Sequence, residues 1–133
     1  MKKEFINPVG LAPSPAYTHS VAVEAGARTI FIAGQVAIDE KGKIVGVGDL
    51  ALQTRRAFDN LALALGGAGA SPADVVKLNL YVVNYKPTDY AAIREVRTGF
   101  FPPGKPPAST LVGVAALALD GLLIEVEAVA VIG

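Results

Sequence analysis

Cysteine and tryptophan are absent from this chain of 133 residues, and histidine occurs once, at His19. A chain without cysteine forms no disulfide and has neither a thiolate nucleophile nor a thiolate metal site. One histidine also excludes a metal site built from several histidines of a single chain. The sequence therefore predicts that no metal is bound.

Neither sign of charge is in excess, because twelve lysines and arginines balance twelve aspartates and glutamates. The absence of a basic run disfavours a phosphate-driven nucleic-acid binder. No apolar stretch is long and uninterrupted enough to span a bilayer, and the start, "MKKEFINPVG", lacks the apolar stretch of a signal peptide. We therefore expect a cytoplasmic protein with neither nucleic acid nor membrane as a partner.

The length favours a single domain, residues 1–133, with one sizeable core, and 52% of the residues are hydrophobic. Apolar β-branched runs predict strands, and apolar residues at helical spacing predict helices. The expected order is strand, strand, helix, strand, helix, strand, strand. The expected elements are a hairpin of strands at 19–26 and 29–38, a helix from the N-cap Asp49 to about Leu65, a strand at 74–85, a helix at 90–101 capped by Thr88 or Asp89, and two last strands at 108–117 and 122–132 turned around Asp120 and Gly121.

Two helices can cover one face of such a sheet, and the other face should be polar if it meets water. In the last strand, however, both alternating sets contain apolar residues. One set is Ile124, Val126, Ala128, Ala130 and Ile132, and the other is Glu125, Glu127, Val129 and Val131. Because large exposed apolar patches are rare on monomers, we expect a homo-oligomer built on the uncovered face. The alternative is a more closed, barrel-like monomer.

Glu125 and Glu127 are the conspicuous polar residues of the last strand, and their spacing of two puts both carboxylates on one face. A carboxylate on a largely apolar face is desolvated, which raises its proton affinity and suits general acid/base catalysis. The alternative is that one or both pair with a lysine or arginine, or lie at a wet edge. A glycosidase pair is disfavoured because no other acid occupies a comparable strand.

Five other residues are candidates for a ligand site. Tyr17 follows the proline-punctuated segment "APSPA", so its hydroxyl is presented to a ligand or its ring packs against the sheet edge. His19 alternates with Tyr17, but no serine or cysteine motif accompanies it, which favours a structural role. Gly34, inside a strand, indicates close backbone approach or a bulge. Arg94 and Arg97 are neighbours on the second helix, either on a solvated face or near a cleft that binds an anion.

Six stretches of the chain occur in the order and spacing of the RidA/YjgF family, and the chain resembles that family over nearly its whole length. The stretches are "PAYTHSVAVEAGARTIFIAGQVAID", "ALQTRRAFDNLALALGGAGAS", "DVVKLNLYVVN", "YAAIREVRTGFFP", "PPASTLVGVAAL" and "LIEVEAVAV". Each piece alone is a weak signal, but the combination is specific.

The resemblance implies an α+β, chorismate-mutase-like fold, with a mixed β-sheet and two helices on one face. It also implies a homotrimer whose uncovered sheet faces line the interior, with a small-molecule ligand in each of three clefts between subunits. The implied activity is hydrolysis of reactive enamines and imines, such as 2-aminoacrylate and its imine tautomer, to a 2-keto acid and ammonia. No cofactor is implied. Nucleic-acid processing, attached to some relatives, is the least expected function because the chain has no basic stripe.

The resemblance also assigns site residues by position. Tyr17 matches the cleft tyrosine, and Gly34 matches the strand glycine whose backbone faces the ligand. Glu125 matches the carboxylate that positions or activates water. Arg94 falls where many relatives have a polar helix residue at the cleft, and Leu111 lies where backbone groups contact the ligand.

The fourth expected strand begins with the hydroxyl pair Ser109 and Thr110, both candidates for the wall of the cleft, and the chain departs from the family at Ser109. Active deaminases of the family have an arginine directly after this "PA", and it grips the substrate carboxylate. Serine offers one neutral donor in place of a charged, two-pronged grip. Arg94, Arg97 and Lys105 are candidates to replace the missing charge. The alternative function is a non-deaminase binder of small molecules that uses the same cleft.

Overall fold

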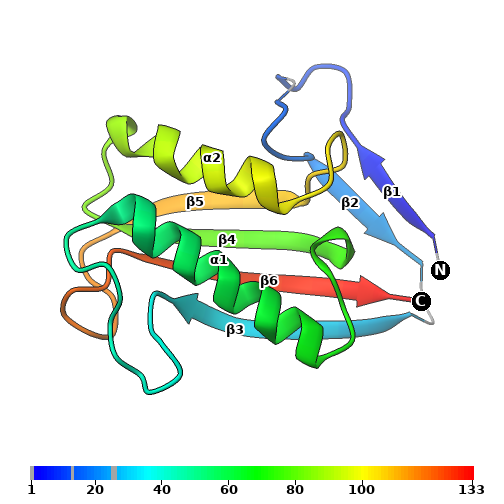
Figure 1. The fold of residues 1–133 in the computed structure, drawn as a ribbon. Coiled ribbons are helices and arrows are strands. Elements are labelled where there is room, and N and C mark those ends of the chain that lie inside the picture. The colour runs from blue at the N-terminus through cyan, green and yellow to red at the C-terminus, as the bar shows by residue number, and fades with distance from the viewer. Residues whose placement is uncertain (1, 13, 25–26) are drawn as a thin grey trace.

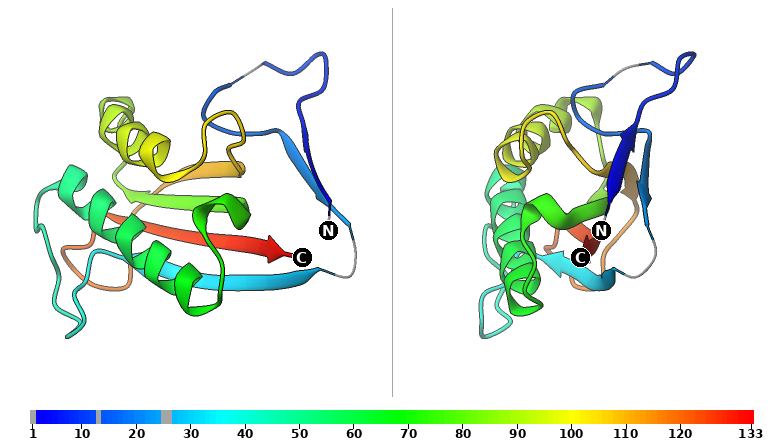
Figure 2. Two further views of the ribbon diagram at one scale, coloured as in Figure 1. Left: turned by 45° about the vertical axis from the view of Figure 1, so that its right-hand side comes forward. Right: turned by 90° about the vertical axis from the view of Figure 1, so that its right-hand side faces the viewer.

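The computed structural model describes residues 2–12, 14–24 and 27–133, and its centre is a four-stranded sheet with two helices on one face (Figure 1). The strands are β1 (Lys3–Ile6), β2 (Ser20–Val23), β3 (Arg28–Val36), β4 (Val75–Val83), β5 (Ala108–Val114) and β6 (Ile124–Ile132). The helices are α1 (Leu50–Gly67) and α2 (Tyr90–Phe100), with the short 3-10 helices η1 (Pro72–Asp74) and η2 (Pro87–Asp89). Figure 2 shows α1 and α2 side by side over the same face of the sheet.

The strand order of the main sheet is β3-β6-β4-β5. β6 is antiparallel to both of its neighbours, β3 and β4, whereas β4 and β5 are parallel. Parallel neighbours need a crossover connection, and α2 provides it between β4 and β5. The expected α+β fold, a mixed sheet with two helices on one face, is confirmed, and β3 and β5 are the edge strands of this sheet.

The expected hairpin between 19–26 and 29–38 is wrong. β2 pairs with β1 in a separate two-stranded sheet, and β3 pairs with β6. The partner of β2 is β1, which was not expected from the sequence. Two of its four residues, "KEFI", are charged and another lysine precedes them, so it lacks the apolar pattern of a strand. Residues 25 and 26 of the expected hairpin lie outside the described residues.

The last two strands are not paired with each other, and β5 ends at Val114 rather than at residue 117. The turn at Asp120 and Gly121 is present, with Gly121 at φ +95°. It does not make a hairpin, because β4 lies between β5 and β6. The sequence of a short apolar strand does not specify the strand with which it pairs. Adjacency in the sequence therefore did not predict the pairing of β5 and β6.

The beginning of α1 is the one that the sequence predicts. The Asp49 carboxylate accepts a hydrogen bond from the backbone N–H of Leu52 at 3.0 Å, which caps the helix. Phe58, Leu61 and Leu65 then point into the core, where each is at most 1% exposed. Burying side chains of this size stabilises the fold by about 1.5–3 kcal/mol each.

Aromatic rings join the two helices. Phe58 of α1 meets Phe100 of α2 edge to face at a centroid distance of 5.0 Å, and Phe100 meets Phe101 at 4.9 Å. Ile93 of α2 is fully buried in the same core. Within the described residues, neither helix is long and apolar enough to cross a membrane.

The two faces of β6 have different surroundings. The helix-facing residues belong to the buried core: Ile124, Val126, Ala128 and Ala130. Glu125, Glu127 and Val129 alternate with them and lie half-buried on the face without helices, called the open face below. Phe31 of β3 pairs with Val129 there and is 80% exposed. The open face is therefore a mixture of apolar groups and carboxylates, as the last strand predicts.

Candidate functional site

Gly34 and Glu125 are in contact across the β3–β6 pair. The register of the pair shifts between Ile32 and Gln35, so Gly34 lies in a bulge. A Cβ atom built on Gly34 would lie 2.6 Å from Cδ of Glu125 and 2.9 Å from its Cγ, and closer still to Oε2. A side chain at position 34 would therefore displace the Glu125 carboxyl group, and the predicted close approach at this residue is that of this carboxyl group.

Glu127 has neutral partners rather than the lysine or arginine considered from the sequence. Its Oε1 accepts a hydrogen bond from Asn79 Nδ2 at 3.1 Å and another, short one from the Tyr81 hydroxyl. The bond to Glu127 raises the pKa of Tyr81, and burial and the charges of Glu127 and Glu125 add to the effect. Tyr81, on β4, is also the register partner of Glu125, on β6. The open face thus holds a polar cluster, Asn79, Tyr81 and Glu127, next to Glu125.

Sequence reasoning missed this cluster, although a signal was available. Asn79 and Tyr81 are two residues apart in a strand, so they share a face. Two polar groups on one face of a central strand need partners, and Glu127 of β6 is the partner of both.

Tyr17 is held at the start of β5 through its neighbour Thr18, which is 2% exposed. The Thr18 hydroxyl donates a hydrogen bond to the carbonyl of Pro106 at 2.5 Å. The Thr18 backbone N–H donates one to the carbonyl of Pro107 at 3.2 Å. The Tyr17 ring packs edge to face on His19, with centroids 5.2 Å apart. Thr18, which the sequence analysis overlooked, therefore joins the Tyr17 segment to the segment that leads into Ser109.

His19 has partners that explain it structurally. Its Nε2 lies 2.8 Å from the carbonyl oxygen of Ala12, and its backbone N–H donates to Asn7 Oδ1 at 3.0 Å. These bonds hold the loop between β1 and β2, in keeping with the structural interpretation. Within the residues that the structure describes, no group of three or more histidine, aspartate or glutamate side chains is arranged to hold a metal ion.

The residues at the start of β5 alternate between the two faces of the sheet. Ser109 and Leu111 are register partners of Leu78 and Leu80, which face the helices, and Leu111 packs against the core. The Ser109 Oγ atom is buried, with no hydrogen-bond partner among the described residues. Thr110 lies on the open face, where its hydroxyl accepts a hydrogen bond from Lys77 Nζ at 2.7 Å.

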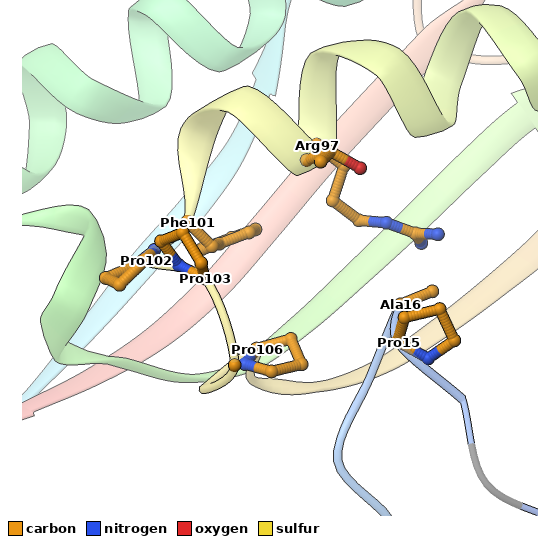
Figure 3. Close-up of a pocket in the computed structure, with 9 residues that line it drawn as sticks. Pro15, Ala16, Arg97, Phe101, Pro102, Pro103 and Pro106 are labelled. Atoms are coloured by element: carbon orange, nitrogen blue, oxygen red, sulfur yellow. The ribbon is translucent and has the colours of Figure 1, made fainter.

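The three candidate cations differ in burial. Arg94 and Lys105 are exposed, whereas Arg97 is 5% exposed. Arg97 Nη2 donates to the Tyr90 hydroxyl at 2.6 Å, and the guanidinium carbon lies 5.4 Å from the centroid of the Tyr90 ring. Arg97 also lines a cavity of about 60 Å³ between α2, the proline-rich loop before β5 and the segment before Tyr17 (Figure 3).

The expected site residues fall into two separate groups in one chain. Gly34 and Glu125 lie together on β3 and β6, at the open face. Tyr17 and Ser109 lie at the start of β5, the edge strand on the far side of β4.

Comparisons with known proteins agree with this fold. A family model described as Endoribonuclease L-PSP matches residues 9–132. The chain belongs to the RidA/YjgF (Rid) family. A RutC family protein of Pyrococcus abyssi is 42% identical over 120 residues, which cover 90% of each chain. A 2-iminobutanoate/2-iminopropanoate deaminase of Dermatophagoides farinae is 34% identical over 122 residues, covering 92% of this chain and 91% of its own. The crystal structure of the Rid family protein YyfB from Yersinia pestis matches with a TM-score of 0.91 and 45% identity over 98% of each chain.

Proposed function

We propose that this Rid-family chain hydrolyses a reactive imine or enamine to a 2-keto acid and ammonia, in clefts between the subunits of a homotrimer. The observation that carries the proposal is the contact between Gly34 and the carboxyl group of Glu125. A carboxylate held in one place over the backbone of a glycine can act as a general base toward a water molecule. The name of the relative from Dermatophagoides farinae, an iminobutanoate and iminopropanoate deaminase, supports the same reaction class.

In this reaction Glu125 accepts a proton from a water molecule as the water oxygen bonds to the C=N carbon. The C=N double bond opens to a C–N single bond, and the nitrogen gains a proton. The resulting carbinolamine then loses ammonia as its hydroxyl proton leaves and a C=O bond forms. One water is consumed for each keto acid and ammonia released, so the step needs no oxidant, reductant or cofactor. A positioned general base of this kind contributes about 10²–10⁴-fold to the rate.

A trimer is proposed because one chain does not bring both groups of site residues together. Phe31, on the open face, is 80% exposed, and apolar surface of this kind is commonly covered by another subunit. Packing of open faces would place the β5 edge of one chain beside the Glu125 of its neighbour. Tyr17, Arg94, Ser109, Thr110 and Leu111 would then form the other wall of each cleft.

The test is the release of 2-keto acid from freshly generated 2-aminoacrylate, compared between the wild type and Glu125→Gln. We expect the variant to lose at least about 100-fold in kcat/KM, because its amide accepts no proton from water. Glu95→Gln is the matched control, since Glu95 is an exposed carboxylate of α2, and it should keep the wild-type rate. A wild-type rate equal to that in buffer would overturn the proposal for this substrate.

A second candidate, a small-molecule binder without deaminase activity, is favoured by one observation at Ser109. The buried Ser109 hydroxyl has no partner among the described residues, and it provides no charge for a carboxylate. A thermal-shift screen distinguishes this candidate: it expects ligands that stabilise the wild type but not a Tyr17→Phe, Glu125→Gln double variant, without turnover. Hits that bind both proteins equally, or no hits, would count against it.

A further inference from the structure

Arg97 is a buried cation that has no anionic partner in the part of the chain that the structure describes. It is 5% exposed, and its guanidinium donates a hydrogen bond to the neutral hydroxyl of Tyr90. Across residues 2–12, 14–24 and 27–133, the only ion pair within 4 Å joins Lys2 and Glu4. Burying a guanidinium without a counter-charge is costly, and proteins normally pair such a group or hydrogen-bond it fully.

The cavity beside Arg97 is suited to a small anion. It has a volume of about 60 Å³, enough for a carboxylate or a few water molecules. Its walls are Pro15, Ala16, Thr98, Phe101 to Gly104 and Pro106. Figure 3 shows the Arg97 side chain extending from α2 toward Ala16 and Pro15. Proline has no backbone N–H, so Arg97 is the principal donor and the only charged group in this lining.

The position of the cavity connects it with the proposed site. Ala16 directly precedes Tyr17, and the carbonyl of Pro106 accepts the Thr18 hydroxyl that fixes this segment. Pro106 is also three residues before Ser109, the position at which active relatives are expected to have the carboxylate-binding arginine. Arg94 and Lys105 are exposed, so water screens their charges more strongly than that of Arg97.

We infer that Arg97 binds the carboxylate of a small 2-imino or 2-oxo acid in this cavity, and so supplies from α2 the charge that Ser109 lacks. The inference rests on the proposed function, which it extends by naming the residue that recognises the acid group. Tyr90 acts as a positioning residue, because its hydroxyl holds one guanidinium nitrogen and leaves the others free to meet the two carboxylate oxygens. The substrate is small, since the cavity is too small for a phosphate-bearing nucleotide.

The experiment measures binding rather than turnover, so its result does not depend on the proposed hydrolysis. Pyruvate is titrated into the wild-type protein and Arg97→Gln, and pyruvamide, its uncharged analogue, is titrated into the wild type. Loss of a charge-assisted hydrogen bond predicts at least about a tenfold weaker Kd for pyruvate with Arg97→Gln, and the same for pyruvamide with the wild type. Arg55→Gln, at an exposed arginine of α1, is the control and should bind pyruvate normally.

The outcomes separate this inference from the proposed function. Pyruvate binding that depends on Arg97, without hydrolysis of 2-aminoacrylate, supports the carboxylate site and overturns the deaminase proposal for this substrate. Hydrolysis with an unchanged KM in Arg97→Gln overturns the carboxylate site alone. Equal binding of pyruvate and pyruvamide by the wild type, or no saturable pyruvate binding, also overturns it. This comparison of two ligands needs no variant, so it can still overturn the inference if Arg97→Gln does not fold.

Discussion

The carboxyl group of Glu125 occupies the space in which any side chain at position 34 would begin. Gly34 lies in the bulge of β3, and Glu125 lies on β6 as the register partner of Val36. The absence of a side chain at Gly34 thus determines where the Glu125 carboxyl group lies. The carboxylate can stay over the backbone only while position 34 has no Cβ atom. This relationship is open to a direct test.

Gly34→Ala should reduce activity far more than stability. The new methyl group displaces the Glu125 carboxyl group, which lies at the end of a flexible side chain, so the backbone need not move. We expect a fall of about 100-fold or more in kcat/KM, because misplacement by about 1 Å has effects of this size. Gly99→Ala is the control, since a Cβ there meets nothing within 4 Å, and its activity should be unchanged. Wild-type kcat/KM in Gly34→Ala would show that the contact is unimportant.

Tyr81→Phe should alter the response of the protein to alkaline pH. The bond to Glu127 raises the pKa of Tyr81 above the ordinary value of about 10. The folded state therefore holds the phenolic proton more tightly, and this stabilisation is complete below about pH 10 and lost as pH rises through the folded pKa. Wild-type stability should fall more steeply above pH 10 than that of the variant.

Ultraviolet absorbance of tyrosinate measures the same effect. The chain has four tyrosines, and Tyr81→Phe should remove a component that titrates late. Glu127→Gln should bring that component to lower pH, because the hydrogen bond to a carboxylate is lost and the charge of Glu127 no longer opposes ionisation. Identical titration curves for the wild type and Glu127→Gln would mean that the hydrogen bond is not formed in solution.

Gln53→Leu should destabilise the fold. This fully buried amide donates to the carbonyls of Gly46 and Gly121 at 3.2 and 2.8 Å, and its Oε1 accepts from the backbone N–H of Leu123 at 2.8 Å. Leucine removes the side-chain partner of the Gly121 carbonyl and of the Leu123 N–H, whereas the Gly46 carbonyl keeps its bond from the Asp49 N–H. The expected cost is about 2–4 kcal/mol in the free energy of unfolding. Denaturant unfolding measures the change. Asp59→Asn, at an exposed position of α1, should stay within about 0.5 kcal/mol.

Phe31→Asp should weaken the proposed trimer. Phe31 is 80% exposed on the open face, and a carboxylate there would be buried without a partner if three open faces meet. Sedimentation should give a trimer for the wild type and smaller species for the variant. Leu63→Asp, at a residue 71% exposed on α1, is the control and should remain trimeric. If both variants assemble alike, the open face is not the interface.

The sequence predicted the elements whose signals are local. Asp49 marks the start of α1, and alternation along β6 separates a core-facing set from the set that contains Glu125 and Glu127. Strand pairing was less predictable, because it depends on which distant edge offers the best partner. β1 therefore took β2 away from the expected hairpin, and β4 came between β5 and β6.

The parts of the site that depend on a single residue were predictable from the sequence. The parts that several elements form together were not. A glycine inside the expected strand predicted that another group lies close to the backbone at Gly34. The burial of Arg97 could not be read from the sequence, since its surroundings come from the segment before Tyr17 and the loop before β5. Arg94, three residues earlier on the same helix, has the same chemistry and is exposed.

Thr18 and its two bonds to Pro106 and Pro107 have a consequence for the entropy of ligand binding. They join segments 88 residues apart into one wall, and the prolines on both sides of the junction have few conformations to lose. Little further ordering is then needed when a ligand arrives, so more of its contact energy is available as affinity. A small ligand makes few contacts, so it could not offset the entropy cost of ordering a flexible wall. A wall that is already rigid removes that cost.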